Sequence, residues 1–219
     1  MSAQGPLRDG NPAGFELIET LRWEPQEGFV RLDRHLSRLA ASAQDLGFEH
    51  SAAEIDRQLA TVAASDEPLR IRLTLEPNGR ADVTAHPFTP LPHDTVWRLG
   101  IARTRLDAAN RLLRHKTTLR QAYEAARAEF AGAQADEVIL LNHCGKVCEG
   151  TITSIFVDHG TGPLRTPPLE CGLLAGVLRA EMLETGRAIE AALTPEDLRE
   201  PGTLFVGNSL RGLIAARLL

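Results

Sequence analysis

The stretch EVILLNHCGKVCEGTITSIFVD, residues 137–158, has the pattern that decides the fold. Short apolar runs alternate with polar and glycine-containing turns, which is typical of short strands. We therefore predict strands at 137–142, 147–150 and 154–158, with a tight turn after the first of them. Glu149 then lies near a strand end within a β-rich segment.

The segments on either side extend this pattern. Upstream, we predict a strand at 96–103 and a helix at 117–130. Downstream, residues 163–175 are predicted as a loop, 177–184 as a helix and 203–208 as a strand. This half of the chain therefore mixes strands and helices.

The first 90 residues predict a separate, small α+β unit. A strand at 15–22 and a partner at 29–32 precede an amphipathic helix that we expect to begin with Asp33 as its N-cap and to end at Gly47. Ser51 is the expected N-cap of a second helix, because a glutamate follows three residues later.

A hairpin and a linker follow. The strictly alternating LRIRLTL at 69–75, a PNG turn and ADVTAHPF at 81–88 predict two paired strands. The segment 87–94 contains three prolines, which disfavour helices and central strands. We therefore predict two domains, a small one at 1–92 and a larger one at 93–219 that carries Lys116.

Composition limits the function further. The 219 residues are 43% hydrophobic and 24% charged, with a formal net charge of −5. That balance argues against a protein that coats nucleic acid. No apolar run approaches the roughly 18 residues of a membrane span, and the opening MSAQGPLRDGNPAG has no apolar signal-peptide core. Three cysteines are too few for a disulfide framework, so we expect a cytoplasmic globular protein.

Lysine is scarce in this chain. Of 24 lysines and arginines, only Lys116 and Lys146 are lysines. A genomic bias toward arginine explains most of this, but lysine can act as a base or nucleophile, whereas arginine stays protonated. Lys116 lies between a predicted strand and a predicted helix, close to other basic residues that favour the unprotonated amine. It is either an ordinary surface lysine or a reactive amine.

Other segments offer groups suited to an anion or a ring nitrogen, and each also has a purely structural interpretation. Glycines at 172–176 precede a predicted helix, whose N-terminal N–H groups can bind phosphate. Asn208 and Ser209 follow the last predicted strand and suit either phosphate oxygens or a simple turn. Arg38 could pair with phosphate or be solvated. Glu149 could hold a protonated ring nitrogen or end its strand in solvent.

We predict no metal site. Cys144 and Cys148 lie beside His143, but a structural zinc site needs a second ligand pair that His159 and Cys171 do not clearly supply. The sequence also has no P-loop, no G-x-S-x-G and no G-x-G-x-x-G motif.

Six segments in order resemble the class IV aminotransferases, the pyridoxal-phosphate enzymes of fold type IV. They are FELIETLR, LDRHLSRLAASA, HKTT around Lys116, NHCGKVCEGTITSIF, CGLLAGVLR and VGNSLRG, from about residue 15 to residue 212. The resemblance implies a two-domain α+β fold similar to D-amino acid aminotransferase, with pyridoxal 5′-phosphate in the cleft between the domains. It also implies a homodimer.

The resemblance further implies a role for each candidate residue. Lys116 matches the lysine that binds the cofactor covalently, and Glu149 matches the carboxylate at the pyridine nitrogen. Arg38 matches an arginine that binds the cofactor phosphate. The remaining phosphate positions correspond to the backbone N–H groups of Val177 and Leu178 and to the side chains of Asn208 and Ser209.

Two positions depart from the family pattern. Ser154 replaces the usual asparagine after the strand of Glu149. In many members a tyrosine shortly after the cofactor lysine binds the ring hydroxyl, but Arg120 occupies that position here. Tyr123, the only tyrosine in the chain, lies seven residues after Lys116.

The HKTT and NSLRG segments are most similar to the 4-amino-4-deoxychorismate lyases. That resemblance implies formation of 4-aminobenzoate and pyruvate in folate biosynthesis. The substrate has two carboxylates, for which Arg105 and Arg211 are candidates. The alternative is a class IV transaminase acting on D-amino or branched-chain amino acids with a 2-oxo acid acceptor. A third hypothesis, a non-catalytic relative, is disfavoured by the intact Lys116 and Glu149.

Overall fold

The computed structural model describes residues 14–132, 134–199 and 204–219, and the chain divides into two compact units. The first contains the described residues up to Thr89 together with Lys116–Leu119, and the second contains Pro90–His115 and Arg120 onward. The first unit thus ends at 89, whereas the prolines predicted a boundary at 92/93. Lys116, however, packs with the first unit, because its neighbours pair with a strand there.

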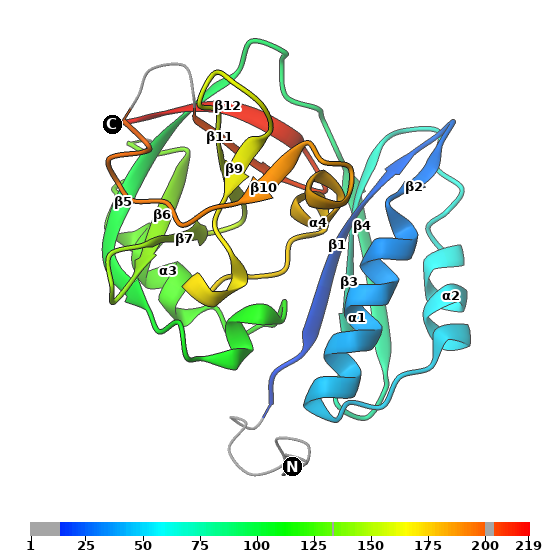
Figure 1. Cartoon of the computed structure of the whole chain (residues 1–219). Helices are drawn as coiled ribbons and strands as arrows, with labels where there is room; N and C mark the ends of the chain where they lie inside the picture. The colour runs from blue at the N-terminus through cyan, green and yellow to red at the C-terminus, as the bar shows by residue number, and fades with distance from the viewer. Residues whose placement is uncertain (1–13, 133, 200–203) are drawn as a thin grey trace. The chain divides into compact units, whose positions relative to one another are not determined.

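The first unit is a four-stranded antiparallel sheet in the order β2-β1-β3-β4 with two helices (Figure 1). Helix α1 packs on β1, and α2 packs on β4. The strands are β1 (Leu17–Glu24), β2 (Gly28–Val30), β3 (Leu69–Leu75) and β4 (Ala81–Pro87), and the helices are α1 (Leu32–Leu46) and α2 (Ala52–Ala60). The predicted hairpin is confirmed, with Leu69 opposite Pro87 and Leu75 opposite Ala81.

The ends of α1 show one correct and one wrong prediction. Gly47 ends the helix in the left-handed conformation, at φ 73°, which glycine adopts without strain. Asp33 is not the N-cap. Arg31 takes that position at φ 60°, and its carbonyl already accepts the N–H of His35, so Asp33 lies inside the first turn. The cap of α2 is as predicted, since Ser51 Oγ accepts the Glu54 N–H at 3.3 Å.

The second unit is built on an eight-stranded mixed sheet in the order β10-β9-β8-β11-β12-β5-β6-β7. β7 at one end of this order also packs against β8, so the sheet is strongly curved, as Figure 1 shows. Its strands are β5 (Val96–Leu106), β6 (Glu137–Asn142), β7 (Val147–Gly150), β8 (Ser154–Val157), β9 (Leu164–Thr166), β10 (Ala188–Glu190), β11 (Leu204–Asn208) and β12 (Gly212–Leu218). Its helical segments are η1 (Arg111–Arg114), α3 (Gln121–Ala128), η2 (Leu169–Cys171) and α4 (Val177–Glu184).

Strand β6 explains why the sheet is buried on both faces. Ile139 and Leu141 belong to one apolar cluster, whereas Val138 and Leu140 belong to another that packs against α3. Alternating side chains of a strand point to opposite faces, so a continuous apolar run is required here. Burial of these four side chains contributes roughly 1.5–3 kcal/mol each.

The strands predicted around residues 137–158 are confirmed, as is α4 at 177–184. Two other predictions are wrong in part. The helix expected at 117–130 begins only at Gln121, because Thr117 and Thr118 pair with β1 instead. The loop expected at 163–175 contains β9 and η2, and β9 is held by parallel pairing with β10. The expected start of a strand at 203 lies outside the described residues.

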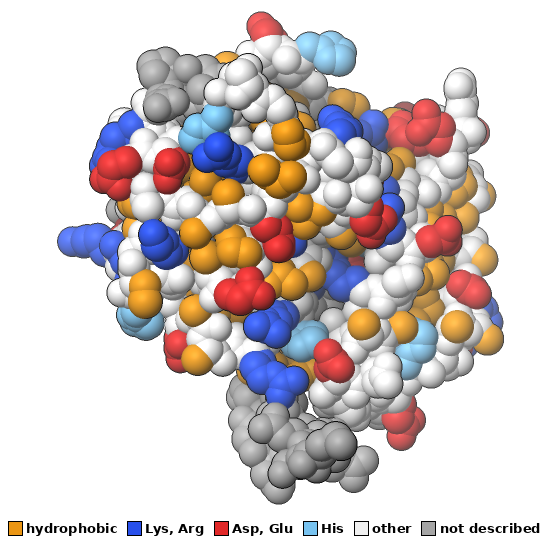
Figure 2. Space-filling view, in the orientation of Figure 1, with side chains coloured by type: hydrophobic (Ala, Val, Ile, Leu, Met, Phe, Trp, Pro, Cys, Tyr) orange, Lys and Arg blue, Asp and Glu red, His pale blue; other side chains and the backbone are white. Residues whose placement is uncertain are grey.

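Charged side chains of both signs are interspersed with hydrophobic ones on the face seen in Figure 2. That mixture agrees with the small net charge of the chain. Within the described ranges, none of the helices has the length and apolar character that crossing a bilayer requires.

Candidate functional site

The backbone around Lys116 is fixed on strand β1. The carbonyl of Lys116 accepts the N–H of Ile18 at 2.8 Å, and the N–H of Thr118 donates to the Glu16 carbonyl at 2.9 Å. Thr118 Oγ1 also accepts the Glu16 N–H at 2.9 Å. Threonine favours extended backbone and uses its hydroxyl for local bonds, so this segment is a short strand. The half-buried Lys116 side chain therefore extends from a rigid backbone.

Arg38 belongs to the same unit and is held by a buried carboxylate. Glu19 on β1 accepts from both Nε and Nη2 of Arg38, and the Nε–Oε1 distance is 2.8 Å. His35, one turn earlier on α1, places Nδ1 2.6 Å from Glu19 Oε2. The Glu19 side chain is 1% exposed and that of Arg38 is 13% exposed. A two-point bond of this kind fixes the plane of the guanidinium.

The electrostatics of Glu19 follow from this arrangement. Burial acts to raise its pKa, but the positive charge of Arg38 and hydrogen bonds from His35 and Arg38 outweigh burial and lower the pKa to about 2. Glu19 and His35 were missed by the sequence analysis. The available signal was a glutamate at an inward position of β1, between Leu17 and Leu21 on the same face.

Glu149 belongs to the second unit, on β7 opposite Leu140 of β6. Its side chain is buried and accepts a hydrogen bond from Tyr123 Oη at 2.7 Å. The Arg120 guanidinium lies 4.3 Å from the centroid of the Tyr123 ring and donates to the Thr151 carbonyl. Tyr123 thus contacts β7, and Arg120 contacts the loop that follows it.

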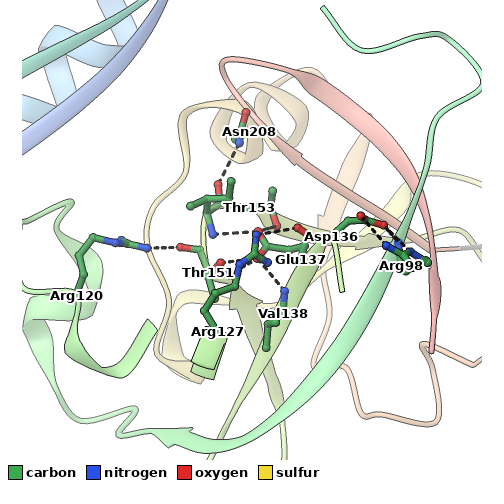
Figure 3. Close-up of polar contacts among 10 residues, drawn as sticks. Arg98, Arg120, Arg127, Asp136, Glu137, Val138, Thr151, Thr153 and Asn208 are labelled. Atoms are coloured by element: carbon green, nitrogen blue, oxygen red, sulfur yellow. Dashed lines mark hydrogen bonds and ion pairs between the residues drawn. The ribbon is translucent and has the colours of Figure 1, made fainter. Parts of the chain in front are cut away.

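A second buried glutamate holds that loop. Glu137, fully buried at the start of β6, accepts from the backbone N–H groups of Thr151 and Ile152 at 3.1 and 3.0 Å (Figure 3). The hydroxyls of Thr151 and Thr153 donate to it as well. Such a carboxylate satisfies several buried donors at once, so the loop between Glu149 and Ser154 has a defined shape. A glutamate that begins an apolar strand was the only sequence signal for it.

The predicted phosphate-binding segments come together at the start of α4. A Cβ on Gly176, the N-cap, would lie 2.7 Å from Ser154 Oγ, and a Cβ on Gly207 would lie 2.8 Å from Leu178 Cδ2. The start of α4 therefore packs closely against β8 and β11. The N-cap residue Gly176 has no side chain that could cap the helix, and the first N–H groups of α4, including those of Val177 and Leu178, lie at this junction.

Asn208 and Ser209 lie in the turn between β11 and β12. Asn208 Nδ2 donates to the Ile152 carbonyl at 3.1 Å, which ties the turn to the loop held by Glu137 (Figure 3). Its Oδ1 accepts the Arg211 N–H at 3.0 Å. Ser209 is buried. Asn208 thus shapes the site through two backbone contacts.

The two candidate substrate arginines differ in their surroundings. Arg211 is half-buried in the turn next to Asn208. Arg105 is exposed, and its Nη1 donates to carbonyls of its own strand, including that of Arg103 at 2.9 Å. These carbonyls belong to an irregular segment of β5, where pairing with β6 shifts in register. Arg211 is therefore the stronger candidate.

The model of the amino-transferase class IV family matches residues 16–219. The chain belongs to the class IV aminotransferase family. Members are pyridoxal-phosphate enzymes of fold type IV, and the mixed α+β architecture of this chain is that fold.

Two of the similar proteins are solved structures. A "Putative amino-acid aminotransferase" from Mesorhizobium loti is 53% identical, with a TM-score of 0.90, over 94% of this chain and 100% of that one. The 4-amino-4-deoxychorismate lyase from Pseudomonas aeruginosa is 26% identical, with a TM-score of 0.78, over 100% of this chain and 88% of that one.

A third relative comes from Schizosaccharomyces pombe and bears the name "Putative aminodeoxychorismate lyase". It is 29% identical over 201 residues, which are 89% of this chain and 86% of the relative. The names of the relatives thus include both a lyase and a transaminase.

Proposed function

We propose that this protein is a pyridoxal-phosphate-dependent lyase that converts 4-amino-4-deoxychorismate to 4-aminobenzoate and pyruvate. The observation that carries the proposal is the extended segment, hydrogen-bonded to the residues at the start of β1, from which Lys116 projects. By the resemblance of the HKTT segment, Lys116 matches the cofactor lysine of the family. The names of the P. aeruginosa and S. pombe relatives support the choice of reaction.

The residues present fit pyridoxal phosphate. An amine, a buried carboxylate, an oriented guanidinium and an N-terminal helix end are the groups that bind its aldehyde, ring nitrogen and phosphate. Gly176 and Gly207 have no room for a Cβ because Ser154, Gly212 and Leu178 occupy that space, so both glycines keep the start of α4 close to β8 and β11. We propose that the protein is a cytoplasmic homodimer.

Each residue then has a defined task. Lys116 binds the cofactor covalently, and Glu149 holds a proton at the pyridine nitrogen. Arg38 and the N–H groups of Val177 and Leu178 bind the phosphate, with Asn208 and Ser209 completing that site. Bound pyridoxal phosphate supplies an electron sink for negative charge at the amine-bearing carbon.

Proton transfer falls to Lys116. Its amine takes the proton from the ring carbon that carries the substrate amine, and the bond to the enolpyruvyl oxygen breaks as the ring becomes aromatic. The proton ends on the methylene carbon of the leaving group, which gives pyruvate. Arg211, with Arg105 as the second candidate, pairs with a substrate carboxylate.

Amino-acid transamination is the second candidate, because the M. loti relative carries that name and is 53% identical. It would use the same Lys116, Glu149 and phosphate site. Only the substrate pocket and the fate of the abstracted proton would differ. D-amino and branched-chain amino acids are the substrates to examine.

One experiment separates the two. The purified enzyme is incubated with 4-amino-4-deoxychorismate and no 2-oxo acid, and separately with an amino acid and 2-oxoglutarate. We expect 4-aminobenzoate and pyruvate from the first mixture. Turnover in the second mixture alone would refute the lyase and establish the transaminase.

A further inference from the structure

Tyr123 and Glu149 form a partly buried hydrogen bond between two elements far apart in sequence. Tyr123 lies on α3 and Glu149 on β7, 26 residues later, and Oη donates to Oε1 at 2.7 Å. Both residues belong to the second unit. Tyr123 is also the only tyrosine of the chain, so its vibrational spectrum can be observed without interference from other tyrosines.

The direction of this bond is fixed by its surroundings. Burial raises the pKa of Tyr123, and the negative charge of Glu149 raises it further. Tyr123 therefore keeps its proton and remains the donor. A hydrogen bond to an ionised acceptor is stronger than one between neutral groups.

The tyrosine is itself held in place. Arg120 lies over its ring at 4.3 Å and donates to the Thr151 carbonyl. Thr151 is bound through its N–H and its hydroxyl to Glu137 (Figure 3). The ring of Tyr123 and the loop that follows Glu149 are thus connected to one network, and α3 supplies one donor to the Glu149 carboxylate.

We propose that Tyr123 is a positioning residue that orients Glu149 toward the pyridine nitrogen of pyridoxal phosphate, a role that rests on the proposed function. A carboxylate accepts several hydrogen bonds through its two oxygens, so Tyr123 can fix one oxygen while the other contacts the ring nitrogen. Loss of the hydroxyl leaves Glu149 with one donor fewer and a less defined orientation. The tyrosine that many relatives place nearer to the lysine is thereby replaced by one that acts on the carboxylate.

The first test is the affinity of the apoprotein for pyridoxal phosphate. We expect Tyr123→Phe to weaken binding roughly tenfold and to shift the pH at which the absorbance of the bound cofactor changes. Glu124→Gln, on the exposed side of the same helix, is the control and should behave as the wild type. Wild-type affinity together with an unshifted pH profile in Tyr123→Phe would overturn the proposal.

The second test leaves Tyr123 in place. In the apoprotein at neutral pH, the Raman doublet of the single tyrosine, which reports how its hydroxyl is hydrogen-bonded, should change in Glu149→Gln, because the charged acceptor is removed. An unchanged doublet would contradict the contact itself. If the wild type takes up no pyridoxal phosphate on Lys116, by mass after borohydride reduction, the proposed function fails, whereas the doublet still tests the contact.

Discussion

Lys116 can be tested against a natural control, because Lys146 is the only other lysine. We expect Lys116→Ala to abolish covalent cofactor attachment and to lower turnover by at least about 10²–10⁴-fold, as loss of a general acid–base group does. Lys146→Arg should retain both. Absorbance of the bound cofactor, borohydride trapping and steady-state rates measure the effect. Covalent attachment that persists in Lys116→Ala would show that another residue binds the cofactor.

Glu19 makes the stability of the protein depend on pH. Its pKa is lowered from 4.5 to about 2 in the folded state, so its stabilisation is fully present above about pH 4.5 and is lost as the pH falls through about 2. We expect Glu19→Gln to reduce the free energy of unfolding by about 3 kcal/mol at pH 7. The deficit relative to the wild type should shrink between pH 4.5 and 2.

Denaturant unfolding at pH 7, 4 and 3 measures this difference. Glu27→Gln, at an exposed position of the turn between β1 and β2, is the control and should leave stability nearly unchanged. An equal deficit for Glu19→Gln at all three pH values would contradict the linkage. If Arg38 binds the cofactor phosphate as proposed, the same variant should also bind pyridoxal phosphate more weakly, because the guanidinium loses its fixed orientation.

At the scale of elements, the junction of α4, β8 and β11 depends on glycine. A Cβ at Gly176 would approach Ser154 Oγ to 2.7 Å, so we expect Gly176→Ala to destabilise the fold by about 1–3 kcal/mol through overpacking. The backbone itself is not the obstacle, because φ at Gly176 is −64°. Adding Ser154→Ala to this variant removes the oxygen that the new Cβ would meet, and should restore much of the lost stability. Thermal unfolding of both variants measures this, and a double variant as unstable as the single one would show that the clash is not the cause.

In the irregular segment of β5, two side chains supply hydrogen-bond partners to backbone N–H and carbonyl groups. Glu129, after the end of α3, accepts the N–H groups of Arg103 and Thr104 at 2.6 and 2.8 Å. Arg105 donates to carbonyls on the same segment. Buried or half-buried backbone groups need partners, so both residues have a structural task that the sequence pattern did not indicate.

At the scale of the whole molecule, the first unit is discontinuous in sequence. Residues 14–89 alone lack the segment 116–119, whose three hydrogen bonds extend the sheet at β1. We expect a fragment ending at 89 to be less stable, by roughly 1–3 kcal/mol, than the same fragment joined to 115–120 through a flexible linker. Circular dichroism during heating measures the difference. Equal melting temperatures would show that the segment contributes nothing to the unit.

The sequence by itself determined the features that depend on local pattern. The alternation in 69–75, the apolar run at 137–142, the glycine that ends α1 and the helix at 177–184 are encoded by neighbouring residues, and all appear in the structure. The order of six short motifs is enough to indicate the family. These signals are local because strand and helix periodicity and capping act within a few residues.

Only the tertiary structure decided which side chains act on one another. Thr117 and Thr118 are extended and not helical, because they pair with Leu17 and Glu16, about 100 positions earlier in the chain. The roles of Glu19, Glu137 and Tyr123 likewise depend on hydrogen-bond partners that lie on other elements. Such contacts depend on how strands and helices pack, and burial then determines the strength and the ionisation of each contact, so no pattern of neighbouring residues could specify them.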